Sequence, residues 1–228
     1  MDIVHNFIQQ GEGEPLILLH GNGEDNSYFD HQMDTFAAAG YRVIAIDTRG
    51  HGTTPRGTAP FTIRQFADDL LGFMDLQGIA KAHLLGFSDG GNIALVFALN
   101  HPERVDKLIL NGANLDTSGV KRKYQIPIEL GYRMTKLFAR RSEDALRKTE
   151  LLGLMVNDPN IAPAKLERIF AQTLVIAGTN DMIKETHTRL IAEHIPNAKL
   201  VLIEGDHFIA NKRPEAFNSA VLEFLKSA

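Results

Sequence analysis

The chain has 228 residues, of which 44% are hydrophobic and 23% are charged, and its formal net charge is −4. This length and composition suit one globular domain, and they exclude a disordered tail, a collagen-like fibre and a disulfide scaffold. The acidic balance argues against nucleic acid as a partner. The absence of cysteine excludes thiolate metal sites and a thiol nucleophile.

The sequence carries no sign of a targeting or membrane segment. Its first basic residue is Arg42, so no positively charged region opens a signal peptide. The apolar stretches fall far short of the ~20 residues that a membrane helix needs. We therefore expect a cytoplasmic protein that acts on a small-molecule substrate and has neither a nucleic acid nor a membrane as partner. Its oligomeric state stays open.

Short apolar runs rich in Leu, Ile and Val recur along the chain, separated by segments with helical spacing. They occupy residues 16–20, 42–47, 82–87, 106–111, 173–178 and 199–205. Continuous apolar runs are typical of strands that are covered on both faces. Their alternation with helices predicts an α/β fold, with a mostly parallel central sheet and helices on both faces. Residues 4–10 are more polar and are expected to form an antiparallel edge strand.

The interval 112–172 breaks this rhythm, because it contains no convincing strand. It is not rich in Gly or Ser, so we interpret it as a helical insertion that caps the sheet. Within it, Ser142 resembles a helix N-cap and Pro163 suits the first position of a helix. Four apolar side chains fit one helix face: Leu130, Met134, Leu137 and Phe138. The insertion is also basic, which indicates either a solvated helix face or a surface that attracts an anionic substrate.

The strongest motif is Gly-Phe-Ser-Asp-Gly at residues 86–90, between a predicted strand and seven consecutive apolar residues. The pattern G-x-S-x-G at a strand-to-helix turn is a nucleophile elbow. Glycine is needed there because the tight turn brings backbones too close for a Cβ atom. The turn exposes Ser88 at a helix N-terminus, where the dipole favours negative charge. We predict Ser88 as a nucleophile.

A serine nucleophile needs a general base, and in the elbow fold the histidine comes last in the chain. His207 follows the last predicted strand, where parallel sheets place their ligands. The other histidines after Ser88 are less suitable. His101 closes the helix after the elbow, and His187 and His194 share one predicted helix as surface or packing residues. We predict His207 as the base.

The acid that orients the imidazole should also follow a strand. Asp181 lies just beyond the run 173–178 and is our first choice. Asp206 is a rival by proximity, but its side chain is expected to point away from the adjacent His207. Asp158 lies in the insertion and is a weaker candidate.

An oxyanion hole needs backbone N–H groups aimed at the developing charge. One donor should be Asp89, the residue after the nucleophile. The other should come from the turn His-Gly-Asn-Gly at residues 20–23, where Asn22 is preferred over Gly23. We interpret His20 as a residue that holds this loop. The turn lacks the lysine of a P-loop and the third glycine of a dinucleotide fingerprint.

The segment Asp-Thr-Arg-Gly-His-Gly at residues 47–52 is read as a hydrogen-bonded turn beside the active site. No histidine pair has the spacing of a known metal motif, so we predict no metal and no cofactor.

Together, these motifs in this order resemble the α/β-hydrolase fold superfamily, in particular its small capped serine hydrolases of bacteria. The resemblance covers essentially the whole chain, so residues 1–228 are expected to form one domain with the insertion as its cap. It implies the same triad and oxyanion donors as above. The chain departs from the family at Gln172, where relatives usually carry proline.

The resemblance implies hydrolysis of a small carboxylic ester or related acyl substrate through an acyl-enzyme. Carbon–carbon bond hydrolases and metal-free haloperoxidase-like enzymes use the same triad and stay open as alternatives. A non-enzymatic ligand-binding or signalling relative is a further alternative. Dehalogenation is disfavoured, because the nucleophile is a serine and the chain has no tryptophan.

Overall fold

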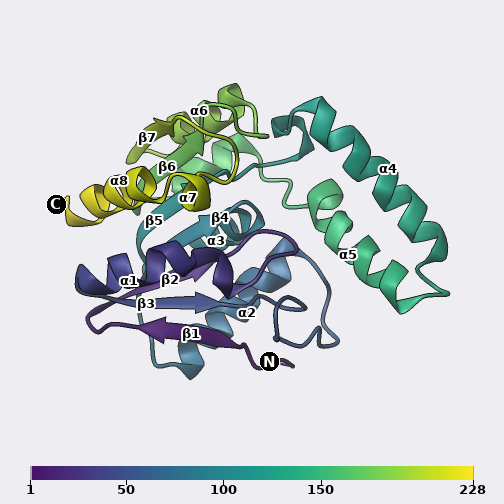
Figure 1. Cartoon of the computed structure of the whole chain (residues 1–228), viewed down its shortest axis with the longest axis horizontal. Coiled ribbons are helices and arrows are strands. Elements are labelled where there is room, and N and C mark those ends of the chain that lie inside the picture. Colours follow the sequence, from purple (N-terminus) through teal and green to yellow (C-terminus); the bar gives the residue numbers. More distant parts are fainter. Residues whose placement is uncertain (1, 228) are drawn as a thin grey trace.

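The computed structural model describes residues 2–227, whose centre is a sheet of seven strands (Figure 1). The strands are β1 (Phe7–Gln10), β2 (Glu14–Leu19), β3 (Tyr41–Ile46), β4 (Ala82–Phe87), β5 (Val105–Asn111), β6 (Gln172–Gly178) and β7 (Ala198–Ile203). They lie in the order β1-β3-β2-β4-β5-β6-β7, and only β1 runs antiparallel to its neighbour. The predicted α/β class and the antiparallel edge strand are confirmed.

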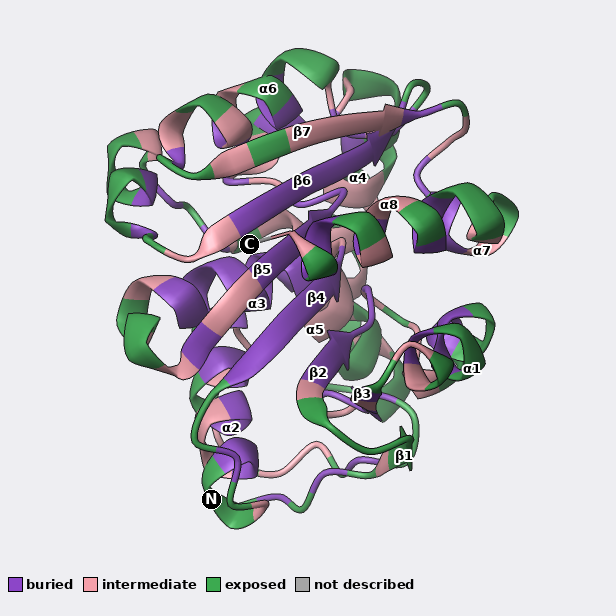
Figure 2. Ribbon diagram, turned by 90° about the vertical axis from the view of Figure 1, so that its left-hand side faces the viewer, coloured by how far each residue is buried: buried purple, intermediate pink, exposed green. Residues whose placement is uncertain are grey.

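Helices cover both faces of the sheet because each strand sends alternate side chains to opposite sides. In β2, Leu16 and Leu18 pack on one side and Ile17 and Leu19 on the other. The first side is covered by α1 (Asp30–Ala38), α7 (Ile209–Lys212) and α8 (Pro214–Lys226). The second is covered by α2 (Ile63–Leu76), α3 (Asp89–Asn100) and α6 (Glu185–His194). The central strands are accordingly buried, while β1 and β7 at the edges are more exposed (Figure 2).

Short 3₁₀ helices complete the connections, at Asn26–Phe29, Pro102–Arg104, Thr117–Gly119 and Pro163–Arg168. The last begins with a proline in its first turn, so the helix predicted there is 3₁₀ rather than α.

Two antiparallel helices project from the sheet between β5 and β6, and we call them the cap hairpin (Figure 1). They are α4 (Arg122–Phe138) and α5 (Glu143–Asn157), and they pack on each other. Ser142 caps α5, since its hydroxyl accepts a hydrogen bond from the N–H of Ala145 at 3.3 Å. Leu154 is 1% exposed and anchors α5 in the core below.

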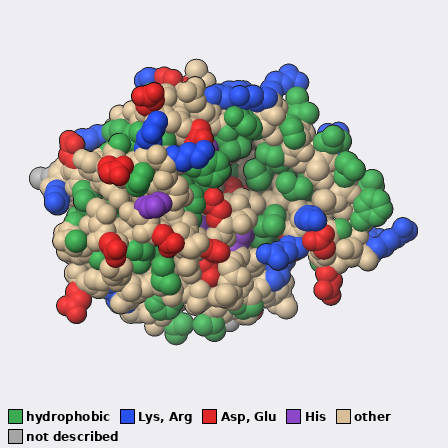
Figure 3. All heavy atoms as spheres, in the orientation of Figure 1, with side chains coloured by type: hydrophobic (Ala, Val, Ile, Leu, Met, Phe, Trp, Pro, Cys, Tyr) green, Lys and Arg blue, Asp and Glu red, His purple; other side chains and the backbone are tan. Residues whose placement is uncertain are grey.

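The outer face of α4 is unusually apolar. The four side chains predicted to share one helix face lie on α4, but they are exposed to solvent instead of packing on the sheet: Leu130, Met134, Leu137 and Phe138. Ile126 on the same helix is exposed as well. In the space-filling view, hydrophobic side chains accordingly spread over the cap (Figure 3). Within the described residues, no helix is both long and apolar enough to span a membrane.

Candidate active site

The turn between β4 and α3 holds Ser88 in a strained conformation. Its φ is 53° and its ψ is −118°, a backbone conformation that residues other than glycine rarely adopt. The N–H of Ser88 donates to the carbonyl oxygen of Asn111 on the neighbouring strand, at 2.8 Å. Glycine is required on either side. A Cβ atom at Gly86 would lie 2.2 Å from the carbonyl oxygen of Gly90, and one at Gly90 would lie 2.0 Å from that of Leu19. The packing of α3 against the strands therefore forces the elbow.

The three residues predicted as a triad come together at the carboxyl ends of β4, β6 and β7. His207 Nδ1 lies 2.7 Å from Asp181 Oδ1, and His207 Nε2 lies 3.0 Å from Ser88 Oγ. A carboxylate only accepts hydrogen bonds, so Nδ1 carries the ring proton and Nε2 is left to accept the serine proton. Asp181 is 2% exposed and His207 is 4% exposed, so water hardly competes for these contacts.

The orientation of Asp181 is fixed locally. Its Oδ1 also accepts the N–H of Ile183 at 2.8 Å. The rival Asp206 faces away from the imidazole, because its carboxylate pairs with the Lys212 ammonium and accepts the N–H of Phe208. Asp158 lies near Asp89 and not at His207.

Three of the other histidines form hydrogen bonds that support the structure. His20 Nε2 accepts the N–H of Thr48 at 3.0 Å, so it joins the loops after β2 and β3. His187 is buried and accepts the N–H of Leu115 at 3.0 Å, and His194 contacts the carbonyl oxygen of Leu190 at the end of α6.

The turn after β3 is also structural. Asp47 accepts backbone N–H groups from Asn26 at 2.8 Å and from Thr53 at 2.9 Å, which agrees with its interpretation as a hydrogen-bonded turn.

The predicted oxyanion donors flank the nucleophile. Asp89 is the first residue of α3, where a backbone N–H has no partner within the helix. Within residues 2–227, no hydrogen bond occupies the backbone N–H of Asn22 or of Asp89. Both groups are therefore available to a developing oxyanion.

The side chains of these two residues interact directly. Asn22 Nδ2 donates to Asp89 Oδ2 at 2.8 Å and to the carbonyl oxygen of Leu151 in α5, also at 2.8 Å. Asn92 donates to the other carboxylate oxygen of Asp89 at 3.3 Å. Burial raises the pKa of Asp89 to about 6; the hydrogen bond from Asn22 opposes this and the charge of Asp158 adds to it.

A second carboxyl group with a raised pKa lies in the turn after β2. Glu24 Oε2 accepts the N–H of Gly21 at 3.1 Å. Burial raises the pKa of Glu24 to about 7, against the lowering effects of that hydrogen bond and of His207. Acidic groups therefore approach the nucleophile from the turn after β2, from α3 and from the cap hairpin.

A cavity of about 20 Å³ opens at the nucleophile, which is room for about one water molecule. It lies between the elbow, the cap hairpin and the loop after β6. Its lining residues are Ser88, Asp89, Asn114, Val120, Gln125, Met155, Asp158, Met182 and Ile183. Sequence reasoning missed Gln125 and Asn114, because polar residues in a helical insertion and a loop carry no spacing signal.

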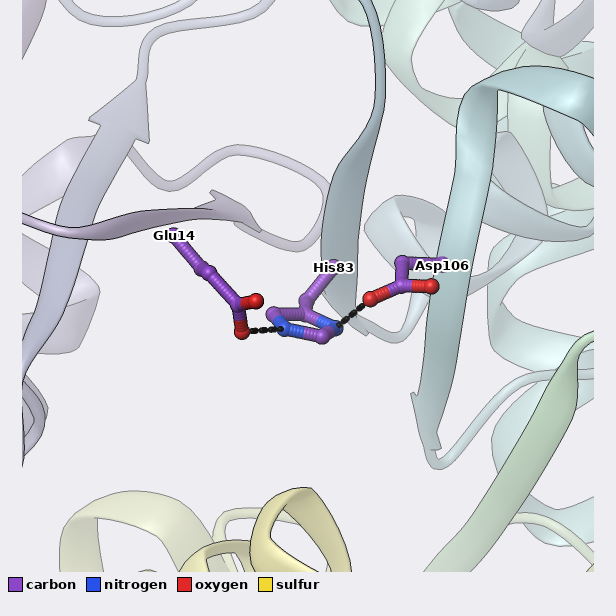
Figure 4. A group of neighbouring side chains, drawn as sticks. All are labelled: Glu14, His83 and Asp106. Atoms are coloured by element: carbon purple, nitrogen blue, oxygen red, sulfur yellow. Dashed lines mark hydrogen bonds and ion pairs between the residues drawn. The ribbon is translucent and has the colours of Figure 1, made fainter. Parts of the chain in front are cut away.

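One cluster elsewhere has the residue types of a metal site. Glu14, His83 and Asp106 meet near the amino ends of β2, β4 and β5, at the sheet edge opposite the triad. In Figure 4 the two carboxylates face different nitrogens of the same imidazole. A single metal ion binds only one ring nitrogen, and Lys81 already pairs with Asp106 at 2.8 Å. This arrangement suits an ion-paired sheet edge better than a metal centre.

Comparisons with known proteins agree with the fold and the motifs. The family model described as alpha/beta hydrolase fold matches residues 14–139. The chain is 31% identical to the protein of Caulobacter sp. (strain K31) named "Putative carbamate hydrolase RutD", over 93% of this chain and 90% of the relative. It is 33% identical to the 2-hydroxy-6-oxononadienedioate/2-hydroxy-6-oxononatrienedioate hydrolase of Burkholderia vietnamiensis (strain G4), over 93% of this chain and 87% of the relative.

Solved structures show the same architecture. The meta-cleavage product hydrolase CumD from Pseudomonas fluorescens IP01 aligns with a TM-score of 0.80 and 26% identity, over 98% of this chain and 94% of that chain. The family model covers more than half of the chain, and the curated relatives match along nearly all of it. The chain therefore belongs to the α/β hydrolase fold family.

Proposed function

We propose that this protein is a serine hydrolase that cleaves small carboxylic esters or related acyl substrates. The observation that carries this proposal is the position of His207, whose ring nitrogens lie 3.0 Å from Ser88 Oγ and 2.7 Å from Asp181 Oδ1. A serine hydroxyl is a weak nucleophile until a base accepts its proton. Here a buried imidazole is within reach of that proton, and its own charged form is stabilised by a carboxylate.

The reaction follows from this geometry. Ser88 Oγ attacks the carbonyl carbon while His207 Nε2 takes its proton, and the N–H groups of Asn22 and Asp89 bind the oxyanion. The imidazolium then protonates the departing alkoxide, which leaves an acyl group on Ser88. A water molecule that gives its proton to His207 attacks the acyl group. Collapse of this second intermediate releases the carboxylic acid and restores the serine.

Carbon–carbon bond hydrolysis, which the sequence left open, is the main competing activity. The Burkholderia relative is named as a hydrolase of dioates, which carry two carboxylates. The cavity at Ser88 is lined instead by Asp89 and Asp158, and repulsion between like charges opposes such a substrate. This charge pattern favours the ester proposal.

The test combines labelling with kinetics. A fluorophosphonate should label Ser88 alone, and p-nitrophenyl acetate should be hydrolysed with a kcat that Ser88→Ala lowers by at least about 10⁴-fold. Asp181→Asn should lower kcat by about 10³- to 10⁴-fold. Asp206→Asn serves as the matched control and should have little effect.

Two results would contradict the proposal. Label on another residue of the folded protein would show that Ser88 is not the nucleophile. Labelling at Ser88 without turnover of any ester would favour a carbon–carbon hydrolase, a haloperoxidase-like enzyme or a binding protein.

A further inference from the structure

Three of the polar side chains that line the cavity at Ser88 carry hydrogen-bond acceptors that a ligand could use. Asp89 is 7% exposed and lines the cavity next to the nucleophile, and Asp158 lines it from the end of α5. Gln125 on α4 is 6% exposed, and its Oε1 has no hydrogen-bond partner. Its Nε2 donates to Glu129 at 3.2 Å, which fixes the amide so that Oε1 remains the free acceptor. A buried acceptor without a partner is costly, so a ligand that donates here gains affinity.

The orientation of Asp89 is set by its neighbours. Asn22 and Asn92 each donate to a different oxygen of its carboxylate, and Asn22 is itself held by the carbonyl oxygen of Leu151. A carboxylate accepts about four hydrogen bonds, so these contacts leave capacity for a ligand. Asn92 is held in turn, because its Oδ1 accepts the N–H of Asn114 at 2.9 Å. The carboxylate is therefore positioned beside the nucleophile before a substrate arrives.

The local charge is negative and only partly compensated. No Lys or Arg is found among the described residues that line this cavity. Arg64, which lies outside the cavity, lowers the pKa of Asp158, and His207 of the triad lowers the pKa of Asp89. Burial raises the pKa of Asp158 above its ordinary value, as it does for Asp89. The charge of Asp158 adds to the raised pKa of Asp89, and a bound cation would relieve this repulsion.

We propose that Asp89, Asp158 and Gln125 form a subsite for a primary ammonium group on the carbon next to the scissile carbonyl. The substrate class is then a small α-amino acyl ester, and the inference rests on the proposed hydrolase function. Asp89 directly follows Ser88, so a group that it binds must lie close to the reacting carbonyl.

This subsite also argues against the attraction of an anionic substrate by the basic insertion, which the sequence left open. The Lys and Arg side chains of the cap hairpin are not among the cavity-lining residues. In Figure 3, Asp and Glu side chains lie beside the hollow that separates the cap hairpin from the sheet. An anionic group on the acyl part would therefore be repelled at the nucleophile.

The first experiment compares kcat/KM for three p-nitrobenzyl esters that differ only in the acyl group. These are alanine with its ammonium group, neutral propionate and the carboxylate-bearing succinate monoester. The wild-type protein should prefer the alanine ester to propionate by about 10- to 100-fold, which is the worth of a hydrogen bond to a charged group. The succinate monoester should be the poorest of the three.

Substitutions then test which residues cause the preference for the alanine ester. Asp89→Asn and Asp158→Asn should each reduce the ratio of alanine ester to propionate ester, and the propionate rate reports any general loss of catalysis. Asp144→Asn removes the same charge from an exposed position on α5, so its ratio should equal that of the wild type. Equal rates for the alanine and propionate esters in the wild type would overturn the subsite while leaving the hydrolase proposal intact.

A binding measurement keeps the inference testable without turnover. In Ser88→Ala, alaninamide should bind and raise the Tm, whereas propionamide, which differs only in lacking the amino group, should not. Asp89→Asn in the same background should abolish the shift. Equal shifts from the two amides would overturn the subsite even if no ester were hydrolysed.

Discussion

At the scale of single residues, burial of acidic groups near the nucleophile dominates the electrostatics. Glu24 and Asp89 both have pKa values raised by burial, to about 7 and about 6. Each carboxylate is costly when ionised, yet Asp89 faces the cavity at Ser88 and Glu24 supports the turn that carries Asn22. Such costs are commonly retained where a charged group is needed for function.

Glu24→Gln should stabilise the protein at alkaline pH. The folded-state pKa of about 7 exceeds the ordinary value of 4.5, so the native state holds the proton more tightly than the unfolded chain. The stability supplied by the protonated form is complete below pH 4.5 and is lost as the pH rises to 7. The variant should therefore match the wild type near pH 4.5 and exceed it by roughly 1–2 kcal/mol at pH 8, because partial exposure weakens the effect.

Urea unfolding at several pH values measures this difference directly. Glu12→Gln makes the same charge change at an exposed position and is the matched control. A stability gain for Glu24→Gln that is the same at pH 4.5 and at pH 8 would contradict the assigned burial of the carboxyl group.

At the scale of elements, α5 is attached to the sheet domain and α4 is attached mainly to α5. Leu154 anchors α5 in the core. Asn22 bonds to Leu151, and Arg56 forms an ion pair with Glu150 at 2.7 Å. The outer side chains of α4 have no such anchor in the described structure. Helical spacing predicts that Leu130 and Leu137 share a face, but it does not reveal whether that face is covered.

Two leucine substitutions in the cap hairpin should therefore differ in cost. Leu154→Ala removes a side chain that is 1% exposed and should lower the free energy of unfolding by about 2–5 kcal/mol. Leu137→Ala removes one that is 76% exposed and should change it by less than about 0.5 kcal/mol. Chemical unfolding of both variants checks the contrast. A large loss in Leu137→Ala would show that the outer face of α4 is covered in solution.

At the scale of the whole molecule, one buried ion pair joins distant parts of the chain. The Arg49 side chain is fully buried, and its Nε and Nη2 donate to the two carboxylate oxygens of Asp69, each at 2.7 Å. Its guanidinium also bonds to Asp2 and to the carbonyl oxygen of Arg56. The loop after β3, helix α2 and the N-terminal segment are thereby joined. The segment at residues 47–52 thus serves the tertiary structure.

Arg49→Met should lower the free energy of unfolding by about 3–5 kcal/mol, because it leaves the buried Asp69 carboxylate with Gln65 as its one remaining side-chain donor among residues 2–227. The double variant Arg49→Met with Asp69→Leu should recover much of that loss, since it leaves no unpaired buried charge. A double-mutant cycle by urea unfolding measures the coupling. Equal costs for the single and double variants would mean that the pair contributes through packing alone.

Local patterns in the sequence were sufficient for much of the architecture. Continuous apolar runs predict buried strands because a covered strand has no polar face, and the ends of most predicted strands lie within two residues of the observed ones. The elbow could be predicted because its glycines and serine are adjacent in the chain, where one tight turn dictates all of them.

Contacts between distant segments were decided only by the tertiary structure. Asp206 precedes His207 in the chain, and Asp181 follows the neighbouring strand of the sheet. Only packing determines that Asp181 faces the ring and that Asp206 pairs with Lys212. The cavity at Ser88 combines Asp89 with Gln125 and Asp158 from the insertion. The spacing of these residues in the sequence does not predict that they come together, because the direction of each side chain depends on how the cap hairpin packs over the sheet.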